Sequence, residues 1–256
     1  MNRRNFILGL TGLVGATILY SSLEPVFIDV TKVKIDLGYN LKALHISDTH
    51  LHGYGYNFEE LCKVISDNTK NVDLVFLTGD IYDEKTPSLK LLEDFLNCIS
   101  KLKIVIYGNH EYYAHNKYSF SEVKRIYESY DSIVLVNESI ELKGVKIGGI
   151  DWYFDEVGLG NKYLSEIGEV NILLSHTPDT FKLKNLHADI VLAGHTHGGQ
   201  ICLPLIGPLW VPSKYGTKYA SGLFYENGIY MYVSRGLGEV IPMRFNCRRE
   251  LVVLEL

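Results

Sequence analysis

The chain has 256 residues, of which 46% are hydrophobic and 21% charged, and its formal net charge is −5 with histidine neutral. This composition is ordinary for a globular protein, and a single domain can accommodate this length. A mildly acidic chain argues against nucleic-acid binding, which usually depends on a basic patch and a high isoelectric point. We therefore expect a globular protein without a nucleic-acid partner.

The N-terminal segment has the pattern of a leader or a membrane anchor. Arg3 and Arg4 precede an uncharged, apolar run over residues 6–23, and about 17–20 such residues can span a membrane. The paired arginines favour a cytoplasmic N-terminus and resemble a twin-arginine export signal. A buried helix is the alternative, although the glycines in the run disfavour a soluble helix. We predict a signal or membrane anchor over residues 1–24 and one extracytoplasmic domain over residues 25–256.

Helices and strands alternate in the first half of that domain, and short strands dominate the second half. Apolar runs at 41–47, 72–77 and 103–107 indicate buried strands. Helices are expected over 57–65, 87–96 and 121–130, and further strands over 26–36, 140–142, 145–150, 170–174, 189–193, 219–225, 229–233 and 251–254. This order predicts an α/β (α+β) fold in which two packed sheets carry helices on their outer faces.

Metal-capable side chains follow five of the predicted strands directly. Carboxylate, imidazole and amide ligands together suit Zn, Mn or Fe better than a thiolate-rich structural site. Their number exceeds the four ligands of one tetrahedral ion and fits two ions about 3.5–4 Å apart, bridged by a carboxylate. In chain order they are Asp48 and His50, Asp80, Asn109 and His110, His176, and His195 and His197.

The same residues fall into a known set of motifs, D-x-H, G-D-x-x-D, G-N-H-[DE], H and G-H-x-H. The chain carries them as Asp48-Thr49-His50, Gly79-Asp80-Ile81-Tyr82-Asp83, Gly108-Asn109-His110-Glu111, His176 and Gly194-His195-Thr196-His197. In these motifs it resembles the calcineurin-like metallophosphoesterases, from residue 41 to roughly residue 255. It is most similar to the membrane-associated bacterial branch with a twin-arginine leader. The resemblance implies a four-layer sandwich of two mixed sheets flanked by helices.

The resemblance also implies a role for each motif residue. One divalent metal would be held by Asp48, His50, Asp80 and His197, and the other by Asp80, Asn109, His176 and His195. His110 would act as a catalytic acid near the leaving oxygen, oriented by Asp83. A hydroxide bridging the two metals would attack phosphorus in a phosphate monoester, diester or pyrophosphate.

Two other functions fit parts of the pattern. A non-catalytic metal-binding scaffold of the same fold should have lost ligands, and this chain has lost none. A dinuclear zinc hydrolase acting on carbon esters or amides would show an H-x-H-x-D-H cluster, which the sequence lacks. Both alternatives are therefore weaker than a phosphoesterase.

Three further features carry predictions. His45 lies inside a predicted strand and is expected in the core, whereas His52 is a possible substrate contact. The four cysteines form no CxxC pair and are expected as small buried apolar residues, with a disulfide left open. Residues 201–212 are mostly apolar with three prolines, which makes them a poor interior strand. They either plug the sandwich or form a lipid-facing rim, and the second alternative predicts a lipid-linked substrate.

Overall fold

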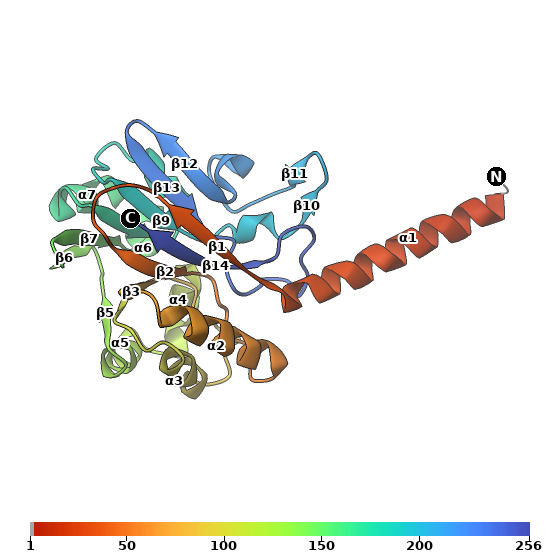
Figure 1. The fold of residues 1–256 in the computed structure, drawn as a ribbon, viewed down its shortest axis with the longest axis horizontal. Coiled ribbons are helices and arrows are strands. Elements are labelled where there is room, and N and C mark those ends of the chain that lie inside the picture. Colours follow the sequence, from red (N-terminus) through yellow and green to blue (C-terminus); the bar gives the residue numbers. More distant parts are fainter. Residues whose placement is uncertain (1–2) are drawn as a thin grey trace.

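A computed structural model describes residues 3–256, in which two six-stranded sheets pack face to face (Figure 1). The first sheet has the order β1 (Ile28–Lys34), β14 (Arg249–Glu255), β2 (Lys42–Ile46), β3 (Leu74–Thr78), β4 (Lys103–Ile106), β5 (Ser132–Val134). The second has the order β12 (Gly222–Glu226), β13 (Ile229–Val233), β9 (Ile190–Ala193), β8 (Ile172–Ser175), β7 (Val145–Ile150), β6 (Glu138–Leu142). Each sheet combines parallel and antiparallel pairs, which confirms the predicted mixed sheets.

Side chains alternate along the strands and so build two layers of core at once. In β3, Leu74 and Phe76 pack between the two sheets, whereas Val75 and Leu77 pack under the outer helices. The helices that cover the first sheet are α2 (Tyr56–Thr69), α3 (Leu89–Asn97) and α5 (Phe120–Ser129), and α7 (Gly160–Ile167) covers the second. Short helices α4 (Asn109–Tyr113) and α6 (Trp152–Glu156) follow β4 and β7. The four-layer sandwich is therefore confirmed.

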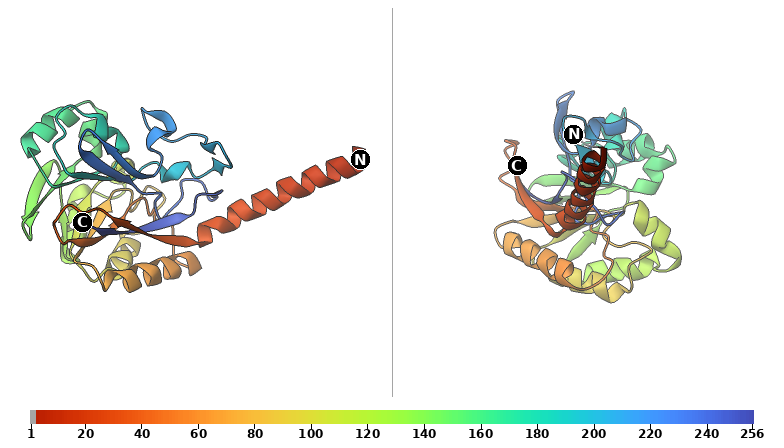
Figure 2. Two further views of the ribbon diagram at one scale, coloured as in Figure 1. Left: turned by 45° about the horizontal axis from the view of Figure 1, so that its top comes forward. Right: turned by 90° about the vertical axis from the view of Figure 1, so that its right-hand side faces the viewer.

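The N-terminal helix α1 (Arg3–Leu23) extends away from the sandwich (Figures 1 and 2). Its C-terminal end is fixed, because the carboxylate of Glu24 accepts the backbone N–H groups of Asn246 and Cys247, each at 2.8 Å. A membrane-spanning segment is predicted above from residues 6–23. Of the helices in the described part of the chain, none is long and apolar enough to cross a membrane.

Two of the four cysteines are joined. Cys62 in α2 and Cys98 at the end of α3 form a disulfide, with their Cα atoms 5.3 Å apart. The prediction of four unpaired apolar cysteines is therefore wrong for this pair, because α2 and α3 pack side by side on one face of the first sheet. Cys202 and Cys247 are free thiols.

Candidate metal centre

The structure brings all seven predicted metal ligands together at one edge of the sandwich. Strands β2, β3 and β4 run parallel in the first sheet, and β8 and β9 run parallel in the second. Their carboxyl ends therefore meet, and the loops that follow them carry the ligands. These are Asp48, His50, Asp80, Asn109, His176, His195 and His197.

The loops turn sharply, and the turns aim the side chains into the centre. Asp48, His50, Asp80, His195 and His197 all adopt left-handed backbone conformations, with φ between 44° and 71°. For residues other than glycine this conformation costs about 1–3 kcal/mol each and gathers at functional sites. The rest of the fold must offset that strain. The strained turns are what direct these side chains into one centre, which indicates a functional site.

One ligand cluster contains Asp48, His50 and His197, whose ligand atoms all lie within 4.8 Å of one another. The Nε2 atoms of His50 and His197 face each other at 3.2 Å. The Nε2 atom of His197 is 3.7 Å from Oδ1 of Asp48. All three residues are buried. One carboxylate oxygen and two imidazole nitrogens therefore converge on one small volume.

A second cluster contains Asp80, His176 and His195, also within 4.8 Å. His176 Nε2 lies 3.0 Å from both His195 Nδ1 and Asn109 Oδ1. Asp80 stands between the two clusters, because its Oδ2 is 3.2 Å from His176 Nε2 and 3.8 Å from His50 Nε2. The Asp80 carboxylate therefore lies within 4 Å of one imidazole from each cluster.

Hydrogen bonds on the outer side fix which nitrogen of each ring faces inward. Nδ1 of His176 donates to the Thr78 carbonyl at 2.8 Å, and Nδ1 of His197 donates to the Gly238 carbonyl at 3.2 Å. Such bonds set the tautomer and orientation of metal-binding imidazoles. They leave Nε2 of both rings facing the centre.

The electrostatics favour neutral imidazoles at two positions and a positive charge at a third. Burial, followed by the charge of His176, lowers the pKa of His195 to about 3. Burial also lowers the pKa of His197 well below its usual range. For His176, burial is outweighed by the carboxylate of Asp80, which raises the pKa to about 10. Neutral imidazole is the form that binds a metal. At His176, the negative charge of Asp80 that favours a bound proton would equally favour a bound metal cation. The donor set therefore fits divalent metals.

Comparison with known proteins agrees with this geometry. The family model of the calcineurin-like phosphoesterases matches residues 41–199 of the chain. The chain belongs to this family. It is 33% identical over 287 residues to a Bacillus subtilis protein named uncharacterized metallophosphoesterase YkuE. That alignment covers 100% of this chain and 98% of the relative. Another relative in that organism, named metallophosphoesterase YkoQ, is 33% identical over 224 residues, 82% of each chain. Phosphodiesterase YaeI of Escherichia coli is 34% identical over 112 residues, covering 40% of this chain and 41% of the relative.

One expected contact of this phosphoesterase differs in the structure. Oδ2 of Asp83 accepts hydrogen bonds from His50 Nδ1 at 3.0 Å and from His52 Nε2 at 2.5 Å. His110 is instead held by Glu84, with Nδ1 and Oε2 at 3.0 Å. The prediction that Asp83 orients His110 is therefore wrong. Asp83 orients His50, one of the predicted ligands, and the next residue in the chain takes the place beside His110.

Glu111 is a supporting residue that the sequence reasoning left without a role. Its fully buried carboxylate accepts the backbone N–H groups of Gly108, Asp80 and Ile81 at 2.7–2.8 Å. Burial, followed by the charge of Asp80, raises the pKa of Glu111 to about 8. Its place at the end of the G-N-H-E motif is the sequence signal that could have identified it. Glu111 ties the loops of Asp80 and Asn109 together.

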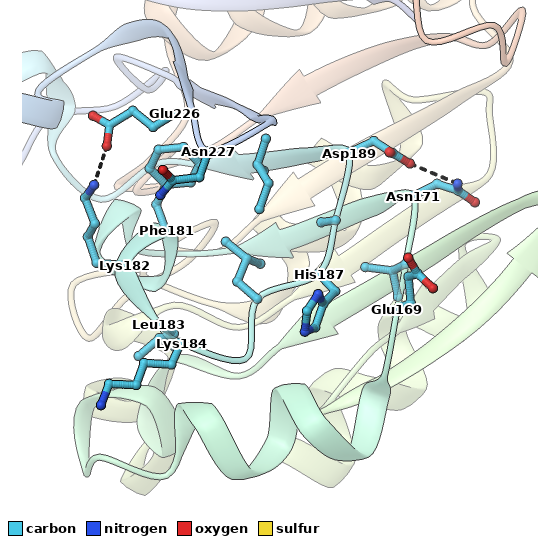
Figure 3. A pocket seen from close by; sticks show the side chains of 14 residues that line it. Glu169, Asn171, Phe181, Lys182, Leu183, Lys184, His187, Asp189, Glu226 and Asn227 are labelled. Carbon is cyan, nitrogen blue, oxygen red and sulfur yellow. Dashed lines mark hydrogen bonds and ion pairs between the residues drawn. The ribbon is translucent and has the colours of Figure 1, made fainter.

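A cavity of about 300 Å³ opens onto the predicted ligands. Asp80, His195 and His197 line it together with the apolar side chains of Trp210 and Ile241. A different cavity of about 700 Å³ lies at the far end of the second sheet, where Asn171 and Asp189 precede β8 and β9 (Figure 3). None of the predicted ligands lines it, whereas four of them line the smaller cavity.

Proposed function

We propose that this protein is a dinuclear-metal phosphoesterase, with Asp80 shared between the two ions. The position of Asp80 between two imidazole clusters is the observation that carries the proposal. When bound, two divalent ions would supply Lewis acidity toward the phosphoryl oxygens and an acidified water as nucleophile. Asp48, His50 and His197 would complete one set of ligands, and His176, His195 and Asn109 the other.

His110 is the protein's own catalytic group in this proposal. Its side chain lines the ligand cavity, is 20% exposed, and lies within 4.8 Å of ligand atoms of His50 and Asp80, but it belongs to neither proposed ligand set. An imidazolium there would donate a proton to the departing oxygen. Glu84 accepts from Nδ1 and so leaves Nε2–H to face the substrate. The name of the Escherichia coli relative, a phosphodiesterase, favours a diester as the bond that is cleaved.

A lipid-linked phosphate ester or pyrophosphate is the substrate class that the cavity supports best. Residues 201–212 do not plug the sandwich, because Ile206 is 71% exposed, Leu209 59% and Trp210 71%. Exposed apolar groups gathered in one place mark interaction surfaces, and tryptophan suits a membrane interface. Trp210 is part of this exposed segment and also lines the cavity that contains the predicted ligands. Ile241, which is 47% exposed, lines the same cavity. An acyl or isoprenyl chain could therefore lie on the surface while its phosphate reaches the centre.

The N-terminal segment fits an export leader that delivers this surface to a membrane. The paired arginines and apolar run are as described above. The end of α1 contacts a segment that pairs with residues 201–212. The Ser21 carbonyl accepts the Arg244 N–H at 2.9 Å, and the Phe245 carbonyl accepts the Cys202 N–H at 2.8 Å. Cys202 begins the hairpin of β10 (Cys202–Leu203) and β11 (Gly207–Pro208), which lies toward the α1 side in Figure 1. The Cys62–Cys98 disulfide agrees with an oxidising compartment, since such bonds are rare in cytosolic proteins. These observations support the proposal that the protein belongs to the membrane-associated branch of its family.

The test compares two substrates on metal-loaded protein, a soluble chromogenic phosphodiester and a lipid phosphodiester embedded in vesicles. Trp210→Ala and Leu209→Ser should lower vesicle activity about tenfold, because burying one large apolar side chain stabilises by about 1.5–3 kcal/mol. Soluble activity should be unchanged. Leu223→Ser is the matched control, since Leu223 is an exposed leucine on β12, outside this surface.

Two outcomes separate the parts of the proposal. Equal loss on both substrates would assign Trp210 and Leu209 to packing and remove the support for a lipid substrate. No hydrolysis of any phosphate ester or pyrophosphate by metal-loaded protein would overturn the phosphoesterase assignment itself.

A further inference from the structure

Cys202 and Cys247 lie together beneath the turn that carries the last two proposed metal ligands. The Cys202 thiol donates to the Gly198 carbonyl at 3.2 Å. The Cys247 thiol reaches the same carbonyl at 3.5 Å and the His197 carbonyl at 3.3 Å. Two thiols distant in sequence therefore meet at one backbone oxygen.

The backbone around both cysteines is fixed, so this meeting follows from the fold. The Cys202 N–H donates to the Phe245 carbonyl at 2.8 Å, and the Asn246 side chain donates to the Cys202 carbonyl at 3.2 Å. The Cys247 N–H is held by Glu24 at 2.8 Å. Segments on either side of each thiol are therefore tied together before any covalent bond joins them.

Access to the two sulfur atoms is unequal. Cys202 is half-buried at the start of the β10–β11 hairpin, whereas Cys247 is only 2% exposed. In thiol–disulfide exchange, a half-buried thiol beside a buried partner can attack an external disulfide first, and the buried thiol then resolves the mixed disulfide. The chain already holds one disulfide, between Cys62 and Cys98.

We infer that Cys202 and Cys247 form a second, reversible disulfide by exchange with a low-molecular-weight disulfide such as glutathione disulfide. The Cys202 sulfur attacks one sulfur of glutathione disulfide, whose S–S bond breaks and releases one glutathione. The Cys247 sulfur then attacks the Cys202 sulfur of the mixed disulfide and releases the second glutathione. The two thiol protons end on the two glutathiones, so the cysteine pair is oxidised by two electrons and glutathione disulfide is reduced by two.

The cross-link changes how the ligand turn is held. Gly198 has φ of +62°, and a Cβ built there would lie 2.7 Å from the Cys247 sulfur, so the turn packs directly on that atom. In the dithiol form the Cys202 S–H donates to the Gly198 carbonyl and the Cys247 S–H to the neighbouring carbonyls of His197 and Gly198. In the disulfide form those donors are gone, and a covalent bond joins β10 to the segment around Cys247. The turn bearing His195 and His197 is then constrained by the cross-link in place of the two hydrogen bonds.

Mass spectrometry after native oxidation tests the pairing. Folded full-length protein is treated with glutathione disulfide and alkylated before digestion. We expect a peptide that joins Cys202 to Cys247, two alkylatable thiols fewer, and full reversal by a reductant. Oxidation should raise the Tm by on the order of 5–10 °C. Hydrogen exchange of residues 194–202 should change on oxidation, a readout that requires no enzymatic activity.

Variants trap each step. Cys247→Ser should accumulate a glutathione adduct on Cys202, because the resolving thiol is gone, whereas Cys202→Ser should form neither adduct nor cross-link. The Cys62→Ser/Cys98→Ser double variant should still form the bond, which excludes disulfide shuffling. Circular dichroism and Tm of the reduced variants establish that they fold. Two thiols that remain alkylatable in oxidised wild-type protein, or a stable glutathione adduct on wild-type Cys202, would overturn the inference.

Discussion

His110 is the residue whose replacement should separate catalysis from metal binding. Because it stands outside both sets of proposed ligands, His110→Ala should keep its metals. The rate should fall roughly 10²–10⁴-fold, the usual contribution of general acid–base catalysis. The loss should shrink for substrates whose leaving groups need no proton. Equal losses on good and poor leaving groups would contradict the acid role.

Glu84 and Asp83 are adjacent carboxylates with different expected effects. Glu84→Gln should lower the rate of hydrolysis of substrates with poor leaving groups, while metal content stays normal. The reason is that the Glu84 carboxylate is hydrogen-bonded to His110, which lies outside both proposed ligand sets. Asp83→Asn should lower metal affinity instead, about 10–100-fold, because Asp83 holds the ligand His50. Metal titrations and leaving-group series on both variants check this. Identical behaviour of the two variants would count against the assignment.

His45 predicts a pH dependence of stability. It is fully buried, as expected from its strand position, and burial lowers its pKa from 6.5 to about 4. Between pH 6.5 and about pH 4, His45 is protonated in the unfolded chain but not in the folded chain, so the free energy of unfolding falls as the pH falls. From pH 7 to pH 5 the wild-type protein should lose about 2 kcal/mol more than His45→Gln. Urea unfolding at both pH values measures this, and parallel losses would refute it.

The ligands were predictable from sequence because each follows an apolar strand, and parallel strand ends meet at one sheet edge. The partner of His110 was not. Asp83 and Glu84 are consecutive, and the loop decides which one turns toward the imidazole. Asp83 is diverted because its Oδ1 accepts the Lys85 and Thr86 N–H groups, at 2.8 and 3.0 Å. Such local turn bonds leave no periodic signal in the sequence.

Helices α2 and α3 are joined by a bond that sequence alone left open. Four cysteines allow three pairings into two disulfides, and only the packing of two helices on one sheet face selects Cys62 with Cys98. The start of the strand predicted over 219–225 is likewise set by packing that the sequence does not reveal. It begins at Gly222, because Gly216–Tyr219 form a 3₁₀ turn that buries Tyr219 against Phe181.

Removing the helix–helix disulfide should destabilise the domain without affecting the metals. Cys62→Ala/Cys98→Ala should lose about 3–4 kcal/mol of unfolding free energy, because a loop of 36 residues is freed in the unfolded chain. Neither cysteine contacts a ligand, so metal content should stay at the wild-type level. Denaturant unfolding of native protein, with reduced wild type as the control, checks the value. Stability equal to the oxidised wild type would mean that the bond contributes nothing.

The whole chain should be oriented with its N-terminus inside and its catalytic domain outside. Arg3 and Arg4 before an apolar run predict this direction. A reporter that is active only after export, fused at Leu256, should be active, and Arg3→Gln/Arg4→Gln should reduce its activity. A reporter active only in the cytoplasm would contradict the orientation.

The metal content of Asp80→Asn tests the shared carboxylate most directly. The Asp80 carboxylate lies within 4 Å of an imidazole from each cluster, so its loss should weaken both sites together. Elemental analysis of purified, metal-reconstituted protein should give two divalent ions per chain for the wild type and for His110→Ala. The same analysis should give well under one ion per chain for Asp80→Asn. Two ions still bound to folded Asp80→Asn would contradict a centre built around Asp80.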